Sequence, residues 1–187
     1  MKGVIISQGK YGATQQYATW LAEELQLSQL TPDKVDTAAT ATYDYVVVGS
    51  SVYVGKLVLN SWLKKHADLL QGKKVFLFIV CATPPSEVEK LQVIRQQNVP
   101  LVLLNQCVVH FLHGRILKKQ LSWKDNFMLR LGAMLQKDPE AKKKMLQDFD
   151  DVRRENIIPL VKDITLYNQE ATTSVYGKGD RSFAPVV

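Results

Sequence analysis

The sequence predicts an α/β fold in three layers, with a five-stranded parallel sheet between helices. Two observations lead to this expectation. Short apolar runs alternate with amphipathic helical patterns along the chain, which is typical of right-handed βαβ units. The runs are continuous and rich in β-branched residues, such as Val46, Val47 and Val48, which indicates strands buried on both faces. The length of 187 residues suits one domain with a full core.

The first unit predicts an anion site. An apolar run at residues 4–6 stops at a small polar loop, and a helical pattern follows at 15–25, with apolar positions at helical spacing. The first backbone N–H groups of such a helix lack internal partners and attract anions. The loop has neither G-x-x-x-x-G-K-[ST] nor G-x-G-x-x-G, which excludes a triphosphate loop and a dinucleotide fingerprint. A short loop closed by Thr14 suits a terminal phosphate monoester.

The next elements follow the same rhythm. We expect a short edge strand near Lys34 and Val35, and further strands at 43–49, 74–80 and 100–110. Helical patterns lie at 57–70, ended by Gly72, and at 87–97. The carboxyl ends of parallel strands meet at one edge of such a sheet, so the loops at 8–14, 50–56 and 81–86 should converge there.

A segment beyond the fifth strand carries a helical stripe of apolar residues among basic ones. The stripe consists of Trp123, Phe127, Met128, Leu131, Met134 and Leu135, and the basic residues are Lys118, Lys119, Lys124, Arg130, Lys137 and the run at 142–144. Such a stripe is typical of a helix that packs in a core or forms a dimer. It also suits a surface helix that meets quinone or membrane lipid while lysines meet anionic headgroups. A second helix should start at Pro139 and run towards residue 158, and residues 167–187 show no periodicity.

Composition and charge narrow the class of protein. The chain is 46% hydrophobic and 22% charged, as ordinary globular proteins are. Residues 1–2 lead straight into the first strand and no apolar run is long enough to span a bilayer, so we expect neither a secretory signal nor a membrane span. Two cysteines without metal spacing suit a reduced, cytoplasmic protein. The net charge of +6 favours an anionic partner, either a membrane surface or a carboxylate-bearing substrate, and no motif favours nucleic acid.

Two stretches, residues 7–18 and 45–56, resemble the flavodoxin family, and the closest branch is the flavodoxin-domain proteins related to menaquinone-dependent protoporphyrinogen oxidase. The phosphate loop of that family reads S-K-Y-G-N-T. Lys10, Tyr11, Gly12 and Thr14 match it, whereas Gly9 and Ala13 replace its serine and asparagine. The resemblance implies a flavodoxin-like sandwich with strand order 2-1-3-4-5 over residues 1–166. It also implies an added helical segment at 115–140. Residues 167–187, which show no periodicity, are expected to form a C-terminal tail.

The resemblance also implies a site for FMN. In the family the first loop binds the phosphate and the next two flank the flavin ring. The corresponding residues here are Gly9, Lys10, Tyr11, Gly12, Ala13 and Thr14 for the phosphate, and Ser51, Val52, Tyr53, Val54, Gly55, Lys56, Ala82, Thr83 and Pro84 for the ring. Four cations are candidates for meeting substrate carboxylates: Lys56, Arg115, Lys118 and Lys119.

The implied function is that of an FMN-dependent oxidoreductase passing electrons from a reduced organic substrate to a quinone-type acceptor, in the cytoplasm or at the inner face of the membrane. Gly9 and Ala13 favour the alternative, a binding or regulatory module that has weakened or lost FMN binding. The basic charge disfavours a small electron carrier, because carriers of this type are usually acidic. No residue pattern indicates a catalytic acid or base, and we expect Cys81 to be inert and His110 and His113 to bind no metal.

Overall fold

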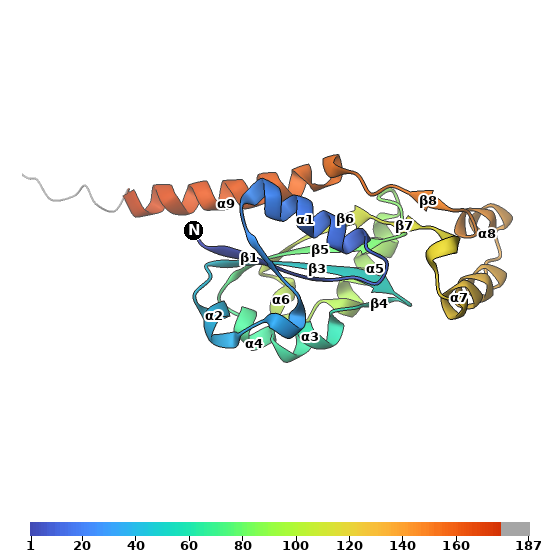
Figure 1. Cartoon of the computed structure of the whole chain (residues 1–187), viewed down its shortest axis with the longest axis horizontal. Helices are drawn as coiled ribbons and strands as arrows, with labels where there is room; N and C mark the ends of the chain where they lie inside the picture. Colours follow the sequence, from blue (N-terminus) through green and yellow to red (C-terminus); the bar gives the residue numbers. More distant parts are fainter. Residues whose placement is uncertain (177–187) are drawn as a thin grey trace, which may run out of the picture.

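A parallel sheet lies between two layers of helices (Figure 1). The computed structural model describes residues 1–176, apart from the side chains of residues 141, 144, 172 and 174–176. Five parallel strands lie in the order β2-β1-β3-β5-β6, which confirms the predicted order 2-1-3-4-5 when these strands are counted along the chain. Their bounds are Gly3–Gln8 (β1), Ser28–Leu30 (β2), Tyr45–Tyr53 (β3), Lys74–Cys81 (β5) and Cys107–His113 (β6).

Three short strands form antiparallel pairs beyond this core. Strand β4 (Lys56–Leu57) folds back on β3, and β7 (Arg115–Ile116) pairs with β8 (Phe149–Asp150). The helices among the described residues are Ala13–Leu25 (α1), Thr37–Ala41 (α2), Asn60–Lys65 (α3), Ala67–Leu70 (α4), Val88–Asn98 (α5), Leu101–Leu104 (α6), Trp123–Met134 (α7), Pro139–Met145 (α8) and Ile158–Tyr176 (α9). In the part of the chain described here, no helix is long and apolar enough to cross a membrane.

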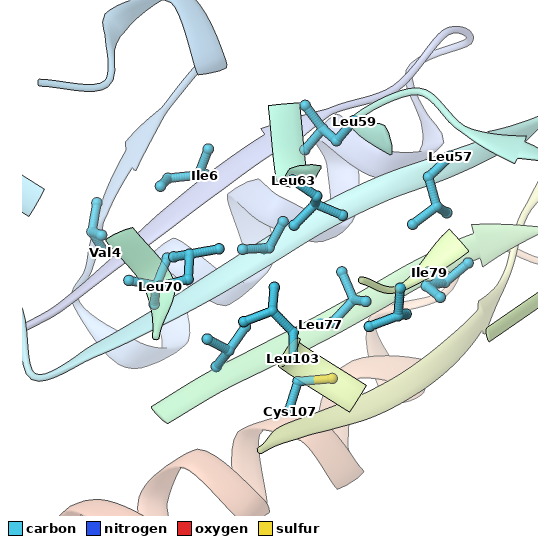
Figure 2. Packing of buried hydrophobic residues seen from close by; sticks show 14 residues of the cluster. Val4, Ile6, Leu57, Leu59, Leu63, Leu70, Leu77, Ile79, Leu103 and Cys107 are labelled. Atoms are coloured by element: carbon cyan, nitrogen blue, oxygen red, sulfur yellow. The ribbon is translucent and has the colours of Figure 1, made fainter. Parts of the chain in front are cut away.

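Alternate residues of each strand point to opposite faces of the sheet, and both faces are covered. Val4 and Ile6 pack with leucines from α3, α4 and α6 on one face (Figure 2). Ile5 packs on the other face with residues of α1 and α9. All three side chains are fully buried. This two-sided burial explains why the strands read as continuous apolar runs.

Strand register brings the functional loops to one edge. Gln8 of β1 lies opposite Ser50 of β3, and Ser51 lies opposite Val80 of β5. Cys81, the last residue of β5, pairs with His113, the last residue of β6. The strands therefore end at nearly the same level, and the loops that follow them emerge side by side.

The second strand lies earlier in the chain than predicted. Gln26 adopts a left-handed conformation with φ of 54° and ends α1, so the chain turns back at once into Ser28–Leu30. Residues Pro32–Lys34, where the edge strand was expected, form a 3₁₀ turn with proline at its start. Proline lacks a backbone N–H and presets this turn, which outweighs the β propensity of Val35.

Two further predictions for the middle of the chain were wrong. The helix expected at 57–70 is broken into β4, α3 and α4. The strand expected at 100–110 starts only at Cys107, because Leu101–Leu104 forms a helical turn after Pro100. Leu103 of that turn is buried, whereas Leu101 is exposed. A short apolar run cannot by its periodicity distinguish a strand from a helical turn.

The C-terminal part also differs from the prediction. Helix α8 ends at Met145 instead of continuing towards residue 158, because Phe149–Asp150 extends to pair with β7. Helix α9 runs through Tyr176, so residues 167–176 are helical rather than irregular. Buried Leu160 and Ile164 anchor this helix on the sheet. The rest of the predicted tail, 177–187, lies outside the described residues.

Candidate functional site

A cavity of about 440 Å³ opens at the carboxyl ends of β1, β3 and β5. Its volume lies in the range of roughly 300–1,000 Å³ that is usual for small-molecule sites. Walls come from all three predicted loops, from the segment that includes β7, and from α7 and α8. The topology of the sheet thus produces a binding-site-sized space where the strand ends meet.

Nine of the fifteen predicted cofactor residues lie on the cavity wall: Lys10, Tyr11, Ala13, Thr14, Ser51, Val52, Tyr53, Val54 and Ala82. The other six are next to the wall in sequence but do not line it: Gly9, Gly12, Gly55, Lys56, Thr83 and Pro84. Among the four cations proposed for substrate carboxylates, Arg115 lines this cavity, while Lys118 and Lys119 line a separate open hollow. The predicted roles of these residues in cofactor binding remain predictions.

The first loop delivers the N-terminus of α1 to the cavity. Gly12 precedes the helix with φ of 78°, a left-handed conformation that glycine adopts without strain. It makes no side-chain cap, so the first N–H groups of α1 are left for another acceptor. Thr14 is the second residue of α1. The predicted anion site depends on these first backbone N–H groups, which have no intrahelical partner.

Two buried hydroxyl groups on the cavity wall lack a partner. Thr14 is 1% exposed, and neither its Oγ1 nor Ser51 Oγ has a hydrogen-bond partner among the described residues. A buried polar group without a partner carries an unrecovered desolvation penalty. These hydroxyls therefore indicate a polar ligand at this end of the cavity.

Gly9 is explained by packing against Thr14. A Cβ atom built on Gly9 would overlap Thr14 Oγ1 and lie close to Ser51 Oγ. The threonine hydroxyl thus fills the space that a serine side chain at position 9 would need. The loop therefore lacks the serine hydroxyl of the family pattern at position 9 and keeps the threonine hydroxyl of that pattern at position 14.

The second loop is a two-residue hairpin turn. Tyr53 pairs with Lys56, and the two residues between them, Val54 and Gly55, have φ of 47° and 73°. Two positive φ values define a type I′ turn, which favours Asn-Gly. Val54 is β-branched and therefore strained in this conformation. Its exposed side chain nevertheless lies on the cavity wall.

Asp125 of α7 joins the first two loops. Its Oδ2 accepts hydrogen bonds from the Tyr11 hydroxyl and from Lys10 Nζ, the latter at 2.7 Å. Its Oδ1 accepts from the Tyr53 hydroxyl at 2.6 Å. Lys10 Nζ also lies 3.5 Å from the centroid of the Tyr53 ring. We call these four residues the Asp125 clamp, because they hold α7 across the cavity.

The clamp shifts the titration of both charged members. Burial alone would raise the pKa of the Asp125 carboxyl, but hydrogen bonds from Lys10, Tyr11 and Tyr53 outweigh burial and hold this pKa well below its usual range. Burial alone would lower the pKa of Lys10, and its hydrogen bonds to Asp125 and Tyr53 raise that pKa instead. Both groups are therefore charged at neutral pH.

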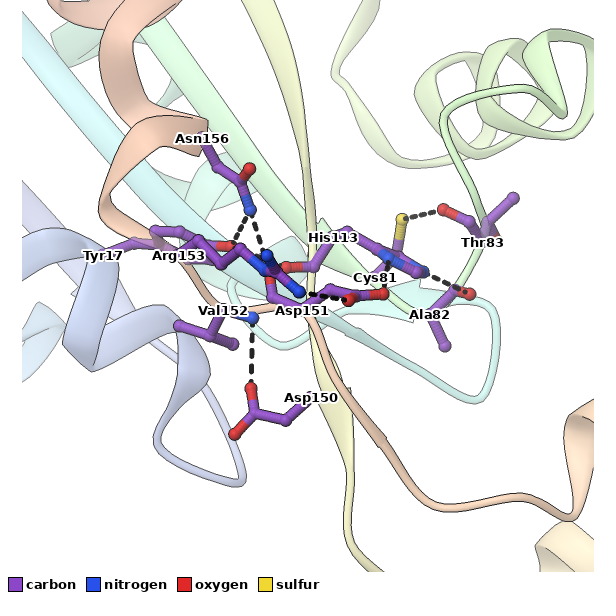
Figure 3. Close-up of polar contacts among 10 residues, drawn as sticks. All are labelled: Tyr17, Cys81, Ala82, Thr83, His113, Asp150, Asp151, Val152, Arg153 and Asn156. Carbon is purple, nitrogen blue, oxygen red and sulfur yellow. Dashed lines mark hydrogen bonds and ion pairs between the residues drawn. The ribbon is translucent and has the colours of Figure 1, made fainter.

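A polar network joins the ends of β5 and β6 to the segment at 150–156 (Figure 3). His113 Nδ1 lies 2.7 Å from Asp151 Oδ2, and His113 Nε2 lies 3.2 Å from the Ala82 carbonyl oxygen. The Tyr17 hydroxyl donates to the His113 carbonyl oxygen at 2.7 Å. Burial raises the pKa of the Cys81 thiol, which donates to the Thr83 carbonyl oxygen. These contacts give His113 and Cys81 structural partners.

The predicted stripe on α7 does not form part of the core. Trp123, Phe127 and Met134 are 75%, 61% and 71% exposed, and only Asp125 and Ala133 among the twelve residues of α7 are buried. The core-helix interpretation of the stripe is therefore wrong. Met128, Leu131 and Leu135 contribute instead to the cavity wall.

Sequence reasoning missed several cavity residues, above all Asp125. The others are Val80, Gly114, Ile116, Leu121, Leu129, Gly132 and Met145. Cys81, also on the wall, belongs to the predicted loop at 81–86. The available signal was Ser122 followed three residues later by an acid, which predicts a helix start. The Ser122 hydroxyl does accept from the Asp125 backbone N–H, so the pattern is a cap. This capping pattern concerns only the backbone N–H of Asp125 and does not predict which residues its side chain contacts.

Comparisons with known proteins agree with this architecture. A family model described as a flavodoxin domain matches residues 4–143. No curated protein matches the chain. Similar solved structures include an archaeal flavodoxin (15% identity, 64% of this chain and 88% of that chain, TM-score 0.43). They also include the Trp repressor binding protein from Bacillus subtilis (11% identity, 73% of this chain and 99% of that chain, TM-score 0.46). A third is a two-electron reduced flavodoxin from Megasphaera elsdenii (14% identity, 76% of this chain and 95% of that chain, TM-score 0.45). With three quarters of its length matched by the family model, the chain belongs to the flavodoxin domain family.

Proposed function

We propose that the cavity binds FMN and that the protein is a flavin-dependent oxidoreductase, passing electrons from a reduced organic substrate to a quinone-type acceptor. The observation that carries this proposal is the pair of buried, unpartnered hydroxyls of Thr14 and Ser51 beside the start of α1. A phosphate monoester would accept from both hydroxyls and from the free N–H groups of the helix.

The remaining walls suit a flat, largely apolar ring. Val52, Val80 and Ala82 lie along the strand ends, and Met128 and Leu131 face them from α7. Tyr11 and Tyr53 both line the cavity, and their hydroxyls donate to the same carboxylate, that of Asp125. The cavity wall therefore carries both the unpartnered Thr14 and Ser51 hydroxyls and a set of apolar residues, and this combination supports a ligand with a phosphate and a flat ring.

The flavin itself would supply the redox chemistry, and the chain would bind and orient the reactants. Arg115 lies on the cavity wall with its Nη1 3.3 Å from Asp150 Oδ2, and its Nε has no partner among the described residues. It is the cation best placed to meet a substrate carboxylate. Leu131 and Leu135 are both partly exposed and both on the wall, so they offer an apolar approach for a quinone. The resemblance of the first two loops to the protoporphyrinogen oxidase branch also supports a reduced organic substrate as electron donor and a quinone as acceptor.

The test is a titration of the purified protein with FMN and with riboflavin, which lacks the phosphate, followed by flavin fluorescence. Thr14→Val keeps the shape of the side chain and removes a hydroxyl that has no partner, so the midpoint of thermal unfolding should not fall. Loss of one hydrogen bond to a charged group corresponds to roughly a tenfold to hundredfold weaker affinity for FMN. Riboflavin affinity should not change. Equal weakening for both ligands would place the phosphate elsewhere.

Turnover is tested on the FMN-loaded protein without oxygen. A carboxylate-bearing reduced substrate should bleach the visible flavin absorption, and a quinone should restore it. Arg115→Gln should raise the substrate concentration needed for bleaching while leaving the FMN affinity unchanged. If no reduced substrate bleaches the flavin, the oxidoreductase proposal fails even where FMN binds.

The Asp125 clamp favours a second candidate, a binding or regulatory module without FMN. A carboxylate already occupies Lys10, Tyr11 and Tyr53, the donors nearest the predicted phosphate loop. If the protein is such a module, the wild-type chain should bind no FMN in the titration described for Thr14→Val. Uptake of FMN by wild-type protein at micromolar concentration would exclude it.

A further inference from the structure

The positive charge of the protein is concentrated in one segment. Residues 118–146 contain eight Lys and Arg residues and three Asp and Glu residues, so the formal net charge of this segment is +5, against +6 for the whole chain. One of the three acids, Asp125, is buried in the clamp. Outside the segment, Asp148 Oδ1 lies 3.9 Å from Lys118 Nζ, a distance typical of a weak surface ion pair. The exposed surface of this segment is therefore strongly cationic.

The same segment exposes large apolar side chains on one side of α7. Successive helix positions are rotated by about 100°, so Trp123, Phe127 and Met134 share one strip, and Asp125 points to the opposite side. The exposed fractions of 75%, 61% and 71% confirm that this strip faces outward. One side of α7 thus closes the cavity while the other side is uncovered.

Cations and aromatic rings lie together on this surface. Lys118, Lys119 and Arg130 line an open hollow of about 470 Å³ with Trp123 and Phe127. Lys124 Nζ lies 5.7 Å from the centroid of the Trp123 ring. Helices α7 and α8 lie at one end of the molecule, beyond the end of the sheet (Figure 1). We call this surface the α7 face and define it by Lys118, Lys119, Trp123, Lys124, Phe127, Arg130 and Met134.

We propose that the α7 face docks on an anionic lipid surface. Exposed tryptophan and phenylalanine can enter the headgroup boundary, while lysine and arginine beside them attract anionic headgroups. Charge complementarity selects this occupant over a second copy of the chain, because two such faces brought together would set like charges against each other. The docking needs no bound flavin, so its test is separate from that of the proposed function.

The experiment is cosedimentation of the full chain with vesicles. Vesicles of equal parts phosphatidylcholine and phosphatidylglycerol should bind the protein, and vesicles of phosphatidylcholine alone should bind it far more weakly. Lys118→Gln with Lys119→Gln should lower partitioning to anionic vesicles about thirtyfold, because each lysine near the surface contributes about one kcal/mol. The matched control is Lys64→Gln with Lys65→Gln, an adjacent and exposed pair on α3, which should change little.

The apolar contribution is tested in the same way. Trp123→Ala with Phe127→Ala should weaken binding, whereas Leu101→Ala with Val102→Ala, an exposed pair on α6, should not. Added salt should release the wild-type protein, because it screens the lysine contacts. Equal binding to both vesicle types, or equal effects of the α7 and control pairs, would overturn the proposal. So would a dimer in sedimentation analysis that the Trp123 and Phe127 changes dissociate, since it would assign the face to a second copy.

Discussion

Replacing Asp125 with asparagine should loosen α7 without unfolding the domain. Asparagine keeps the shape and leaves one oxygen to accept from the Tyr53 hydroxyl, which lies 2.6 Å from Oδ1. The amide nitrogen that replaces Oδ2 cannot accept from Tyr11 or Lys10. Helix α7 buries only Ala133 besides Asp125, so few apolar contacts can compensate.

The size of the effect follows from these two lost contacts. A hydrogen bond from a neutral donor to a buried charge contributes about 1.5–3 kcal/mol. The Lys10 side chain is 36% exposed, so its contact is closer to a surface pair, at about 0.5 kcal/mol. Together they lower the free energy of opening α7 by about 2–3.5 kcal/mol, or roughly 30-fold to 400-fold in the opening equilibrium.

Hydrogen exchange of the α7 backbone amides measures this equilibrium. Amides of α7 should exchange roughly 30-fold to 400-fold faster in Asp125→Asn, while those of β3 and β5 should keep their protection. Glu140→Gln is the matched control, because it removes one negative charge from an exposed position in the neighbouring helix.

The pH dependence has a defined sign. The pKa of Asp125 is lower in the folded protein than the value of about 3.9 for a free aspartate. The clamp therefore contributes its full stabilisation at pH values above the pKa of Asp125 in the unfolded chain. This stabilisation is lost only as the pH falls through the lower pKa that Asp125 has in the folded protein. Protection of α7 in the wild type should persist at about pH 4, where free aspartates are half protonated. Unchanged exchange in Asp125→Asn, or exchange matched by Glu140→Gln, would refute the clamp.

Two further predictions concern the loops at the cavity. Val54→Asn should raise the free energy of unfolding by about 1 kcal/mol, because asparagine tolerates positive φ better than a β-branched residue. For a chain of this size, that gain corresponds to a rise of about 2–4 °C in the midpoint of thermal unfolding. Val93→Asn, at an exposed helical position, is the control and should give no rise. Gly9→Ser, which restores the family residue, should destabilise by about 1–3 kcal/mol, because its Cβ would overlap the Thr14 hydroxyl. Adding Thr14→Ala should recover part of that loss, and a stabilised Gly9→Ser single variant would contradict the packing described here.

The sequence by itself determined the sheet and the place of the cavity. Val46, Val47 and Val48 form a continuous apolar run because both faces of their strand are covered, and this property is visible without coordinates. Alternating strands and helices then fix the handedness of the crossovers and bring the loops to one edge. The glycine at position 12 likewise reveals the turn before α1, because its φ of 78° suits no other residue as well.

Local sequence could not determine elements whose conformation depends on distant partners. The extended residues Phe149–Asp150 exist because β7 pairs with them, although the local pattern favours a continuing helix. Helix α9 is held by burial of Leu160 and Ile164 against a sheet whose last strand, β6, ends at His113, 47 residues before Leu160. In both cases tertiary contacts outweigh local propensity.

Only the tertiary structure decided how the added helices relate to the cavity. Asp125 and Trp123 are two residues apart, and the helical period places them on opposite sides of α7. Which side faces the sheet depends on Lys10, Tyr11 and Tyr53, which lie more than seventy residues away in the chain. Because the Asp125 carboxylate accepts hydrogen bonds from three donors, the side of α7 that carries Asp125 faces the cavity. The side that carries Trp123 and Phe127 is exposed to solvent. Periodicity predicts that a helix has two faces, but only the contacts it makes on folding determine which of them is buried.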